Sequence, residues 1–311
     1  MTGAPDMAKE RKLRESYESR NYKAKKSRSL REEELKDYVT GLFEGDGSIW
    51  IQKEGEKGKR HNPRLTITFN RKDIPICKKL IDILGEGRIG YNKGENACDL
   101  VISSVAGLKR IVKFINGRMR TPKIYRLNKL IDWLNKHNNE NIGKEQILKG
   151  GMGKDNWLGG FIDADGSFGI RYTEREGKAR KRRVGCVMSI EQRMEDSNTK
   201  ESYKEVMQEI AGLIGVKLRI RKQKATGREY YIVRGSSKRS IEIIMNYFER
   251  YRLNTSKYME YKDWKIVAEM ILKGEHYSEE GLRIIREIKG RMNRNRKEYN
   301  WNHLDDLKID S

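Results

Sequence analysis

The stretch "GLFEGDGSIWI" (Gly41–Ile51) joins an apolar helical run to a β-like segment through acids and glycines. A second stretch, "GFIDADGSFGIRY" (Gly160–Tyr172), repeats its skeleton of Gly, two apolar residues, acid, small residue, Asp, Gly and Ser. The last acids of the two stretches are Asp46 and Asp165. A motif repeated at this spacing predicts an internal duplication, and therefore two similar structural halves.

The duplication extends beyond the motif. "Thr121-Pro122-Lys123" recurs as "Thr255-Ser256-Lys257", each time before a helical pattern that contains Tyr and Trp. Each copy reads as helix, strand, strand, helix, strand, strand and further helices, and the strands alternate apolar and polar residues. This alternation is typical of an antiparallel sheet that packs on one face only. We therefore predict an α+β fold with two pseudo-symmetric halves.

The boundaries follow from shifts in composition. We predict a basic N-terminal arm (residues 1–30), a first half (31–135), a linker rich in Asn and Gly (136–154), a second half (155–297) and a C-terminal tail (298–311). The arm is interpreted as a solvated segment, with phosphate contacts as the alternative.

Composition limits the class of partner. Lys and Arg number 67 against 45 acids, which gives a formal net charge of +22. Such an excess opposes compaction unless a polyanion neutralises it, so nucleic acid is the favoured partner. A membrane surface is the weaker alternative, because no apolar run reaches the ~18 residues of a spanning helix. Three cysteines without metal-type spacing predict reduced thiols, and the N-terminus lacks the apolar core of a secretory signal.

The first motif predicts a helix from about Glu32 to Gly45. Its small residues Gly41 and Gly45 are four apart, and the second motif has Gly160 and Ala164 in the same places. Small residues at this spacing let two helices approach closely. Merely tolerated glycines are the alternative, but a mid-helix Gly costs about 1 kcal/mol relative to Ala, and both copies keep the pair.

The acids that end the motifs predict a metal site. A lone Asp-Gly is most often a simple turn. Here Asp46 and Asp165 lie at helix C-termini, where the helix dipole disfavours a carboxylate. If the two helices pack together, the carboxylates converge and each raises the pKa of the other. A divalent cation such as Mg²⁺ removes both problems, and it suits metal-assisted hydrolysis of phosphodiesters.

One predicted sheet face is basic. Lys217, Arg219 and Arg221 alternate with apolar residues, so they project from the same side of a strand. With Arg171 and Arg234 they form a surface suited to a DNA groove. A solvated face is the alternative, but like charges on one face are unfavourable without a partner.

The motifs "VTGLFEGDG" (Val39–Gly47) and "LGGFIDADG" (Leu158–Gly166) resemble those of the LAGLIDADG homing endonucleases, in the single-chain form with two motifs. The resemblance covers nearly the whole chain after residue 30. The first motif departs from the pattern at Thr40 and at Glu44, which stands for the first Asp. We expect Glu44 and its counterpart Asp163 to be less critical than Asp46 and Asp165.

The resemblance implies αββαββα halves with saddle-shaped antiparallel sheets that face DNA, and motif helices that meet at an interface containing Gly41 and Gly160. It implies a Mg²⁺-dependent DNA endonuclease that cuts both strands of a long asymmetric target, with Ca²⁺ or Mn²⁺ as alternative ions. The implied metal-binding and catalytic residues are Asp46 and Asp165 with Gly45 and Ala164 at the metal, Lys123 and Lys257 near the phosphates, and Thr66 and Ser189 as water-orienting positions.

The residues expected to face DNA are Ser48, Trp50, Gln52, Ser167, Arg171, Lys217, Arg219, Arg221 and Arg234. The resemblance further implies a monomer in a mitochondrion or another organelle. The alternative function is an intron RNA maturase on the same fold, which the basic segment "RMNRNRK" (Arg291–Lys297) could serve. A third hypothesis is a DNA-binding protein that has lost cleavage, and two intact motif acids argue against it.

Overall fold

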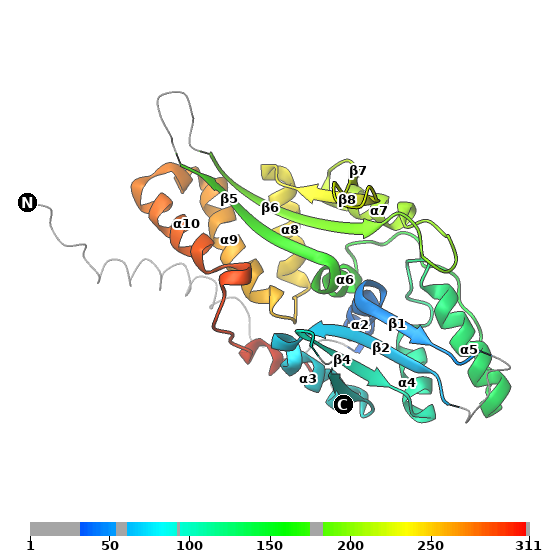
Figure 1. Cartoon of the computed structure of the whole chain (residues 1–311). Coiled ribbons are helices and arrows are strands. Elements are labelled where there is room, and N and C mark those ends of the chain that lie inside the picture. Colours follow the sequence, from blue (N-terminus) through cyan, green and yellow to red (C-terminus); the bar gives the residue numbers. More distant parts are fainter. Residues whose placement is uncertain (1–31, 54–60, 92–93, 175–182, 309–311) are drawn as a thin grey trace, which may run out of the picture.

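The computed structural model describes residues 32–53, 61–91, 94–174 and 183–308, and the predicted N-terminal arm (1–30) lies outside these ranges. Two halves follow one another (Figure 1). The first comprises α2 (Glu32–Asp46), β1 (Gly47–Trp50), β2 (Arg64–Asn70), α3 (Ile74–Leu84), β3 (Arg88–Tyr91), β4 (Ala97–Ile102), α4 (Val105–Ile115) and α5 (Ile124–Asn138). The second comprises α6 (Trp157–Asp165), β5 (Gly166–Thr173), β6 (Arg183–Arg193), α7 (Lys204–Ile214), β7 (Arg219–Lys222), β8 (Glu229–Gly235), α8 (Lys238–Arg250), α9 (Lys257–Lys273) and α10 (Glu279–Arg291).

Each half contains one antiparallel sheet. The strand orders are β1-β2-β4-β3 and β5-β6-β8-β7, so the two halves share one topology. Their registers also agree, because Gly47 pairs with Ile67 and Gly166 pairs with Ile190. The predicted α+β fold with two pseudo-symmetric αββαββα halves is therefore confirmed.

The two copies use the same residues to begin and end equivalent helices. Ser104 and Ser237 are the N-caps of α4 and α8, and each side chain accepts a hydrogen bond from the backbone N–H three residues later. Gly85 and Gly215 end α3 and α7 in the left-handed region, with φ of 64° and 72°. These caps satisfy backbone groups that a helix leaves unpaired, so the sequence defines the helix ends locally.

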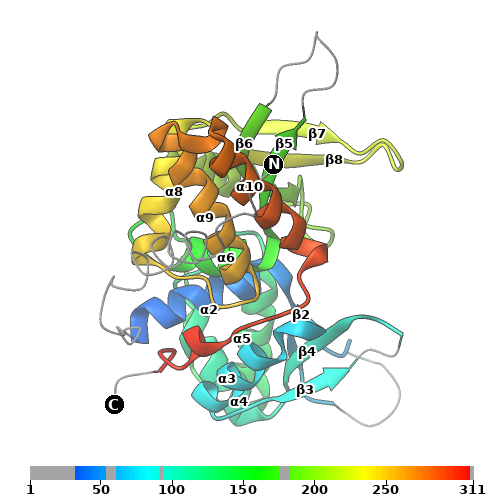
Figure 2. The same cartoon turned by 90° about the vertical axis from the view of Figure 1, so that its left-hand side faces the viewer.

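One face of each sheet is buried by helices, as the alternation predicted. In β2, Leu65, Ile67 and Phe69 are buried and the residues between them are more exposed. Figure 2 shows α8, α9 and α10 on one side of the second sheet. The prediction for β7 was wrong in one respect: this edge strand begins only at Arg219, and Ile220, expected on the apolar face, is 57% exposed.

The motif helices α2 and α6 pack against each other more closely than ordinary side chains allow. A Cβ added at Gly41 would lie 1.9 Å from the carbonyl oxygen of Trp157, and one at Gly160 would lie 1.9 Å from that of Tyr38. A Cβ at Gly45 would lie 2.1 Å from the Cβ of Ala164. The small residues are therefore required by backbone contact, which confirms the predicted helix interface.

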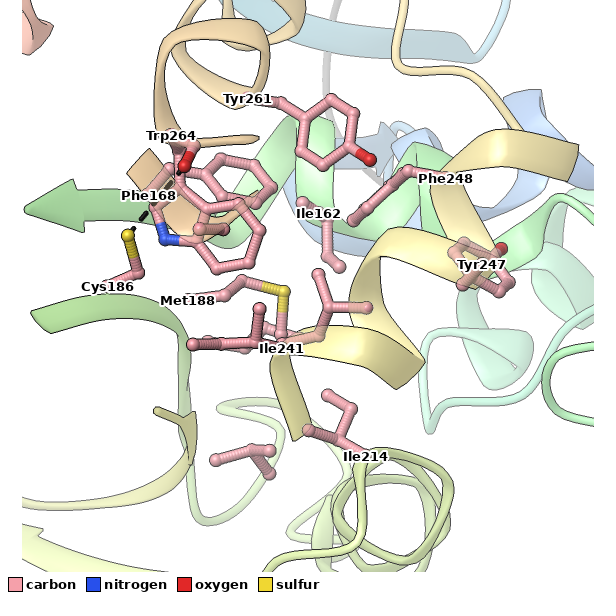
Figure 3. Packing of buried hydrophobic residues seen from close by; sticks show 14 of the residues in the cluster. Ile162, Phe168, Cys186, Met188, Ile214, Ile241, Tyr247, Phe248, Tyr261 and Trp264 are labelled. Atoms are coloured by element: carbon pink, nitrogen blue, oxygen red, sulfur yellow. Dashed lines mark hydrogen bonds between the residues drawn. The ribbon is translucent and has the colours of Figure 1, made fainter. Parts of the chain in front are cut away.

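Each half has its own hydrophobic core. In the second, Phe168 lies among Phe248, Tyr261 and Trp264, with ring centroids 5.5–5.8 Å apart (Figure 3). Cys186 packs beside them, 3.7 Å from the carbonyl oxygen of Trp264. All three cysteines are buried, with free thiols. None of the described helices is long and apolar enough to span a membrane.

The predicted ends of the halves need correction. Helix α5 continues to Asn138, past the predicted boundary at 135. Residues 298–308 do not form a tail. Together with residues 292–297 they form what we call the C-terminal strap (residues 292–308), which runs from α10 to the first half (Figure 1). Leu304 and Leu307 of the strap are buried in the core of the first half, because their apolar side chains gain free energy when they leave water.

Candidate active site

The two motif acids converge where α2 and α6 end. Asp46 and Asp165 are the last residues of these helices, and the strands β1 and β5 begin directly after them. A Cβ at Gly45 would lie 3.5 Å from Oδ2 of Asp165, so the acid of one helix lies against the end of the other. Both acids line one cavity of about 460 Å³, which we call the Lys123-side cavity; its lining also includes Ser48, Lys123, Arg126, Gln192, Arg193 and Asp196.

This crowding changes the acidity of both groups. Burial, and then the charge of Asp46, raise the pKa of Asp165 to about 6. Partial burial also raises the pKa of Asp46, while Lys257 and Lys123 lower it. Two neighbouring carboxyl groups whose ionisation is disfavoured by burial form a site that gains free energy from binding a cation.

Lys123 and Lys257 bind the ends of the motif helices. The Nζ of Lys123 donates to the carbonyl oxygens of Gly45 (2.5 Å), Gly47 (2.9 Å) and Phe43 (3.3 Å). The Nζ of Lys257 donates to those of Ala164 (2.5 Å), Asp163 (2.8 Å) and Ile162 (3.2 Å). A cation at a helix C-terminus offsets the negative end of the dipole, so each lysine compensates for an acid placed there.

These hydrogen bonds bear on two expectations: that the lysines lie near the phosphates, and that Gly45 and Ala164 lie at the metal. Burial lowers the pKa of Lys123 to about 8 against the raising influence of Asp165 and Asp46. The three donors of each ammonium group already have acceptors within the protein. The carbonyl oxygens of Gly45 and Ala164 accept from the lysines, and a second lone pair on each remains for another partner.

Glu44 and Asp163 have a structural role in the two halves. The carboxylate of Glu44 accepts from the backbone N–H groups of Arg120 and Thr121, from the Thr121 hydroxyl and from Nε1 of Trp157. Burial raises the pKa of Glu44 to about 6, and these donors oppose the shift. The loop that presents Lys123 is thereby fixed to the end of α2 and to the opposite helix α6.

Asp163 repeats this arrangement in the second half. It accepts from the backbone N–H groups of Asn254 and Thr255, from the Thr255 hydroxyl and from the Tyr38 hydroxyl of α2. Glu44 and Asp163 are therefore buried hydrogen-bond centres that position the lysines. The prediction that they matter less for cleavage than Asp46 and Asp165 stays a prediction.

Gln192, which sequence reasoning missed, contacts a motif acid. Its Nε2 donates to Oδ2 of Asp165 at 2.9 Å. The residue expected near this acid, Ser189, instead shares a hydrogen bond with the Ser167 hydroxyl at 3.0 Å, because its side chain is short and faces across to β5. Thr66, the expected counterpart, pairs in register with Ser48, and the described lining of the cavity contains Thr68 instead. The strand register would have identified Gln192. Ile190 pairs with Gly166, the residue after Asp165, and Gln192 lies two residues further along β6, on the same face as Ile190.

An ion pair across the two halves was also missed. Nη2 of Arg126, on α5, lies 2.9 Å from Oδ2 of Asp196, which follows β6. Both residues line the Lys123-side cavity. The backbone N–H groups of Asn198 and Thr199, together with Arg126, lower the pKa of Asp196 against its burial. No local sequence pattern connects two residues so far apart in the chain.

The open faces of the sheets carry most of the residues expected to face DNA. Ser48, Trp50, Ser167, Arg171, Lys217, Arg219, Arg221 and Arg234 are all exposed. Burial and the nearby charges of Arg171, Arg221 and Arg219 lower the pKa of Arg234, so these arginines form one cluster. Arg221 is partly neutralised by Glu191 at 2.5 Å. Gln52 lies beyond the end of β1, and its Oε1 accepts from the backbone N–H of His61.

The donor set fits a hard divalent cation that shares its coordination with other ligands. No group of three or more His, Cys, Asp or Glu side chains with metal-binding geometry occurs among the described residues. Asp46 and Asp165 provide two carboxylates, and Mg²⁺ commonly takes one or two, with water and substrate phosphate completing its octahedral shell.

Comparisons with known proteins agree with this architecture. The sequence model of the family described as "LAGLIDADG endonuclease" matches residues 39–134 and 158–268, one match in each half. The "Intron-encoded DNA endonuclease aI3" of Saccharomyces cerevisiae is 26% identical over 307 residues, covering 88% of this chain and 73% of that protein. The "Uncharacterized cox1 intron-2 37.2 kDa protein" of Schizosaccharomyces pombe is 28% identical over 249 residues, covering 79% and 68%.

Solved structures share the fold. The I-LtrWI LAGLIDADG homing endonuclease bound to target DNA superimposes with a TM-score of 0.65 at 21% identity, covering 86% of this chain and all of that one. The I-SmaMI LAGLIDADG homing endonuclease bound to cleaved DNA gives a TM-score of 0.64 at 20% identity, with 84% and 98% covered. At this level of identity the similarity supports the fold.

Proposed function

Because the chain belongs to the LAGLIDADG endonuclease family, we propose that it is a site-specific, Mg²⁺-dependent homing endonuclease that cuts both strands of a long asymmetric DNA target. The observation that carries the proposal is the convergence of Asp46 and Asp165 at the ends of α2 and α6, between two sheets with open polar faces. The DNA-bound relatives I-LtrWI and I-SmaMI share this fold.

The residues divide the work as follows. Asp46 and Asp165 would hold the divalent ion, which supplies Lewis-acid stabilisation of charge during phosphodiester hydrolysis. Lys123 and Lys257 hold the helix ends in place and add positive charge beside the acids, where charge develops on the phosphate. Gln192 orients the carboxylate of Asp165 through its amide. The arginine cluster of the second sheet neutralises backbone phosphates, and the strand side chains contact base edges in the major groove.

The test begins with a target selected by cleavage from a randomised DNA library in the presence of Mg²⁺. On that target, Asp165→Asn is expected to abolish cleavage of at least one strand, while binding measured by gel shift survives. Cleavage of both strands at the wild-type rate by this variant would disprove the assignment of Asp165.

The alternative function is that of an intron RNA maturase. The sequence feature behind it is the basic segment Arg291–Lys297, and the structure pairs two of its four basic residues with acids: Arg291 and Arg296 pair with Asp263, and Arg296 also pairs with Glu260. The alternative is tested by splicing of the cognate intron with purified protein. Splicing by an Asp46→Asn, Asp165→Asn variant would show an activity independent of cleavage.

We further propose a monomer that acts in a mitochondrion. One chain contains both motif helices, so α2 and α6 form their interface without a second subunit. The proposed location draws on the relatives, two of which are named as products of introns, one of them in cox1. Size-exclusion chromatography with light scattering tests the first point, and fractionation of the source cells tests the second.

A further inference from the structure

A second cavity lies on the other side of the α2–α6 pair. Its volume is about 590 Å³, and we call it the Lys257-side cavity. Its lining contains four cationic side chains and one carboxylate, namely Lys72, Lys257, Arg294, Arg296 and Glu260. The Lys123-side cavity has three cations and three carboxylates, namely Lys123, Arg126, Arg193, Asp46, Asp165 and Asp196. The Lys257-side cavity is therefore the one with an unbalanced positive charge.

The difference arises at equivalent positions. Arg126 and Glu260 each lie three residues after the lysine of their half, so a cation in one half is replaced by an acid in the other. Likewise, the strand registers make Asn70 the counterpart of Arg193. On the Lys257 side the missing cations are supplied by the C-terminal strap, which adds Asn293, Arg294, Arg296 and Tyr299 to the lining.

Glu260 anchors the strap in this position. One of its carboxylate oxygens accepts from the backbone N–H of Asn293 at 2.7 Å, and the other accepts from Nε of Arg296 at 2.6 Å. Asn293 adopts a left-handed backbone with φ of 57°, and its side-chain amide donates to the carbonyl oxygen of Phe168 at 3.3 Å. A single buried acid thus fixes both ends of a short turn, and the two residues between them are Arg294 and Asn295.

Neither Arg294 nor Lys72 forms an ion pair with a residue of the described ranges, although the charge of Lys72 lowers the pKa of the neighbouring Asp73 against its burial. Arg296 is committed to Glu260 and Asp263, but Arg294 is exposed and forms no ion pair with any described residue. Lys72, in the first half, lies over the ring of the strap residue Tyr299, 5.4 Å from its centroid. Arg294 and Lys72 line the same cavity. An arginine fork and a lysine ammonium in one cavity suit the oxygens of a phosphate group.

We infer that the C-terminal strap builds a phosphate-binding site on the Lys257 side, where Arg294 and Lys72 hold a backbone phosphate of the DNA strand that passes Ser167 and Lys257. This inference rests on the proposed function for its substrate. It also makes the two sides of the nuclease unequal, because the Lys123 side has no equivalent segment among the described residues. Positioning of one strand, and therefore its cleavage, depends on the strap.

The first measurement is the salt dependence of binding to a short fluorescent DNA duplex of mixed sequence, with Arg294→Ala, Lys72→Ala and the control Arg283→Ala. Arg283 is a partly exposed arginine of α10 that pairs with Glu280, and it does not line the cavity. Loss of one phosphate contact lowers the slope of log Kobs against log salt by about 0.9. We expect that change for Arg294→Ala and Lys72→Ala and none for Arg283→Ala; an unchanged slope for Arg294→Ala overturns the inference.

The second measurement is strand-resolved cleavage of the selected target with each strand labelled. Arg294→Ala is expected to slow cleavage of one strand about tenfold and leave the other near wild type, and Arg294→Lys is expected to restore part of the loss. Equal slowing of both strands, or no slowing, contradicts the inference. If the wild-type protein binds DNA but cuts neither strand, the proposed function fails, and the salt slope still decides whether Arg294 contacts phosphate.

Discussion

The two sides of the α2–α6 helix pair are alike where the helices pack and different where the cavities begin. Inside, each motif has an aromatic residue that donates to the first acid of the other motif, Tyr38 to Asp163 and Trp157 to Glu44. At the Lys123-side cavity, Gln192 contacts Asp165, whereas the register places the apolar Phe69 at its counterpart. The comparison teaches that the two halves use equivalent residues where the helices pack closely and different residues around the motif acids.

The largest expected effect concerns what the two sides share. Gly160→Ala places a methyl group against the backbone of Tyr38, which cannot move without separating α2 from α6. We expect a loss of more than about 3 kcal/mol in the free energy of unfolding, measured by urea denaturation, and a similar loss for Gly41→Ala. The control is Gly290→Ala in α10, where a Cβ meets nothing within 4 Å. That variant should gain up to about 1 kcal/mol, and equal losses in all three would refute the packing argument.

The next effect tests the strap, which only one side has. Leu307 is fully buried in the core of the first half, so Leu307→Ala should lower the free energy of unfolding by about 2–4 kcal/mol. Leu148→Ala in the linker is the matched control, because Leu148 is 39% exposed and should change stability by less than about 0.5 kcal/mol. A negligible loss for Leu307→Ala would return residues 298–308 to the role of a tail.

A smaller effect tests the hydrogen bond to Asp165, which Gln192 makes and its counterpart Phe69 cannot make to Asp46. Gln192→Leu removes the amide that orients Asp165 and should slow cleavage of one strand about tenfold, as loss of an outer-sphere hydrogen bond commonly does. Phe69→Leu, at the equivalent position, keeps an apolar side chain and should leave the ratio of the two strand rates unchanged. Strand-labelled cleavage measures both variants, and a changed ratio in Phe69→Leu would show that this position also affects cleavage, which contradicts the unequal contact.

The smallest expected effect is a shift in pH dependence. The pKa of Asp165 is about 6, above the usual value of a carboxyl, so its metal-binding form is lost as pH falls through 6. The Mg²⁺ concentration for half-maximal cleavage should therefore rise steeply below that pH, and added Mg²⁺ should move the midpoint downward. Gln192 lowers this pKa, so Gln192→Leu should move the midpoint upward. If neither added Mg²⁺ nor Gln192→Leu shifts the pH midpoint, Asp165 does not bind the metal.

Much of the fold could be predicted because its signals are local. Alternation in residues 64–70 gave a strand, and the repeated Gly-x-x-x-small pairs gave the helix contact, since backbone approach depends only on the size of the side chain. The strand ends were less certain. Ile220 lies exposed on an edge strand, because hydrophobic alternation cannot show how far a sheet extends beyond the helices that cover it.

The sequence by itself determined the duplication, the order of helices and strands, and the two acids at the helix ends, because each of these is encoded in neighbouring residues. Only the tertiary structure decided which side chains meet those acids. Gln192 reaches Asp165, Arg126 pairs with Asp196, and the strap carries Arg294 to Lys257 through contacts between distant segments. Such contacts depend on the register of strands and the docking of the two halves, and no pattern within a short stretch of sequence records either.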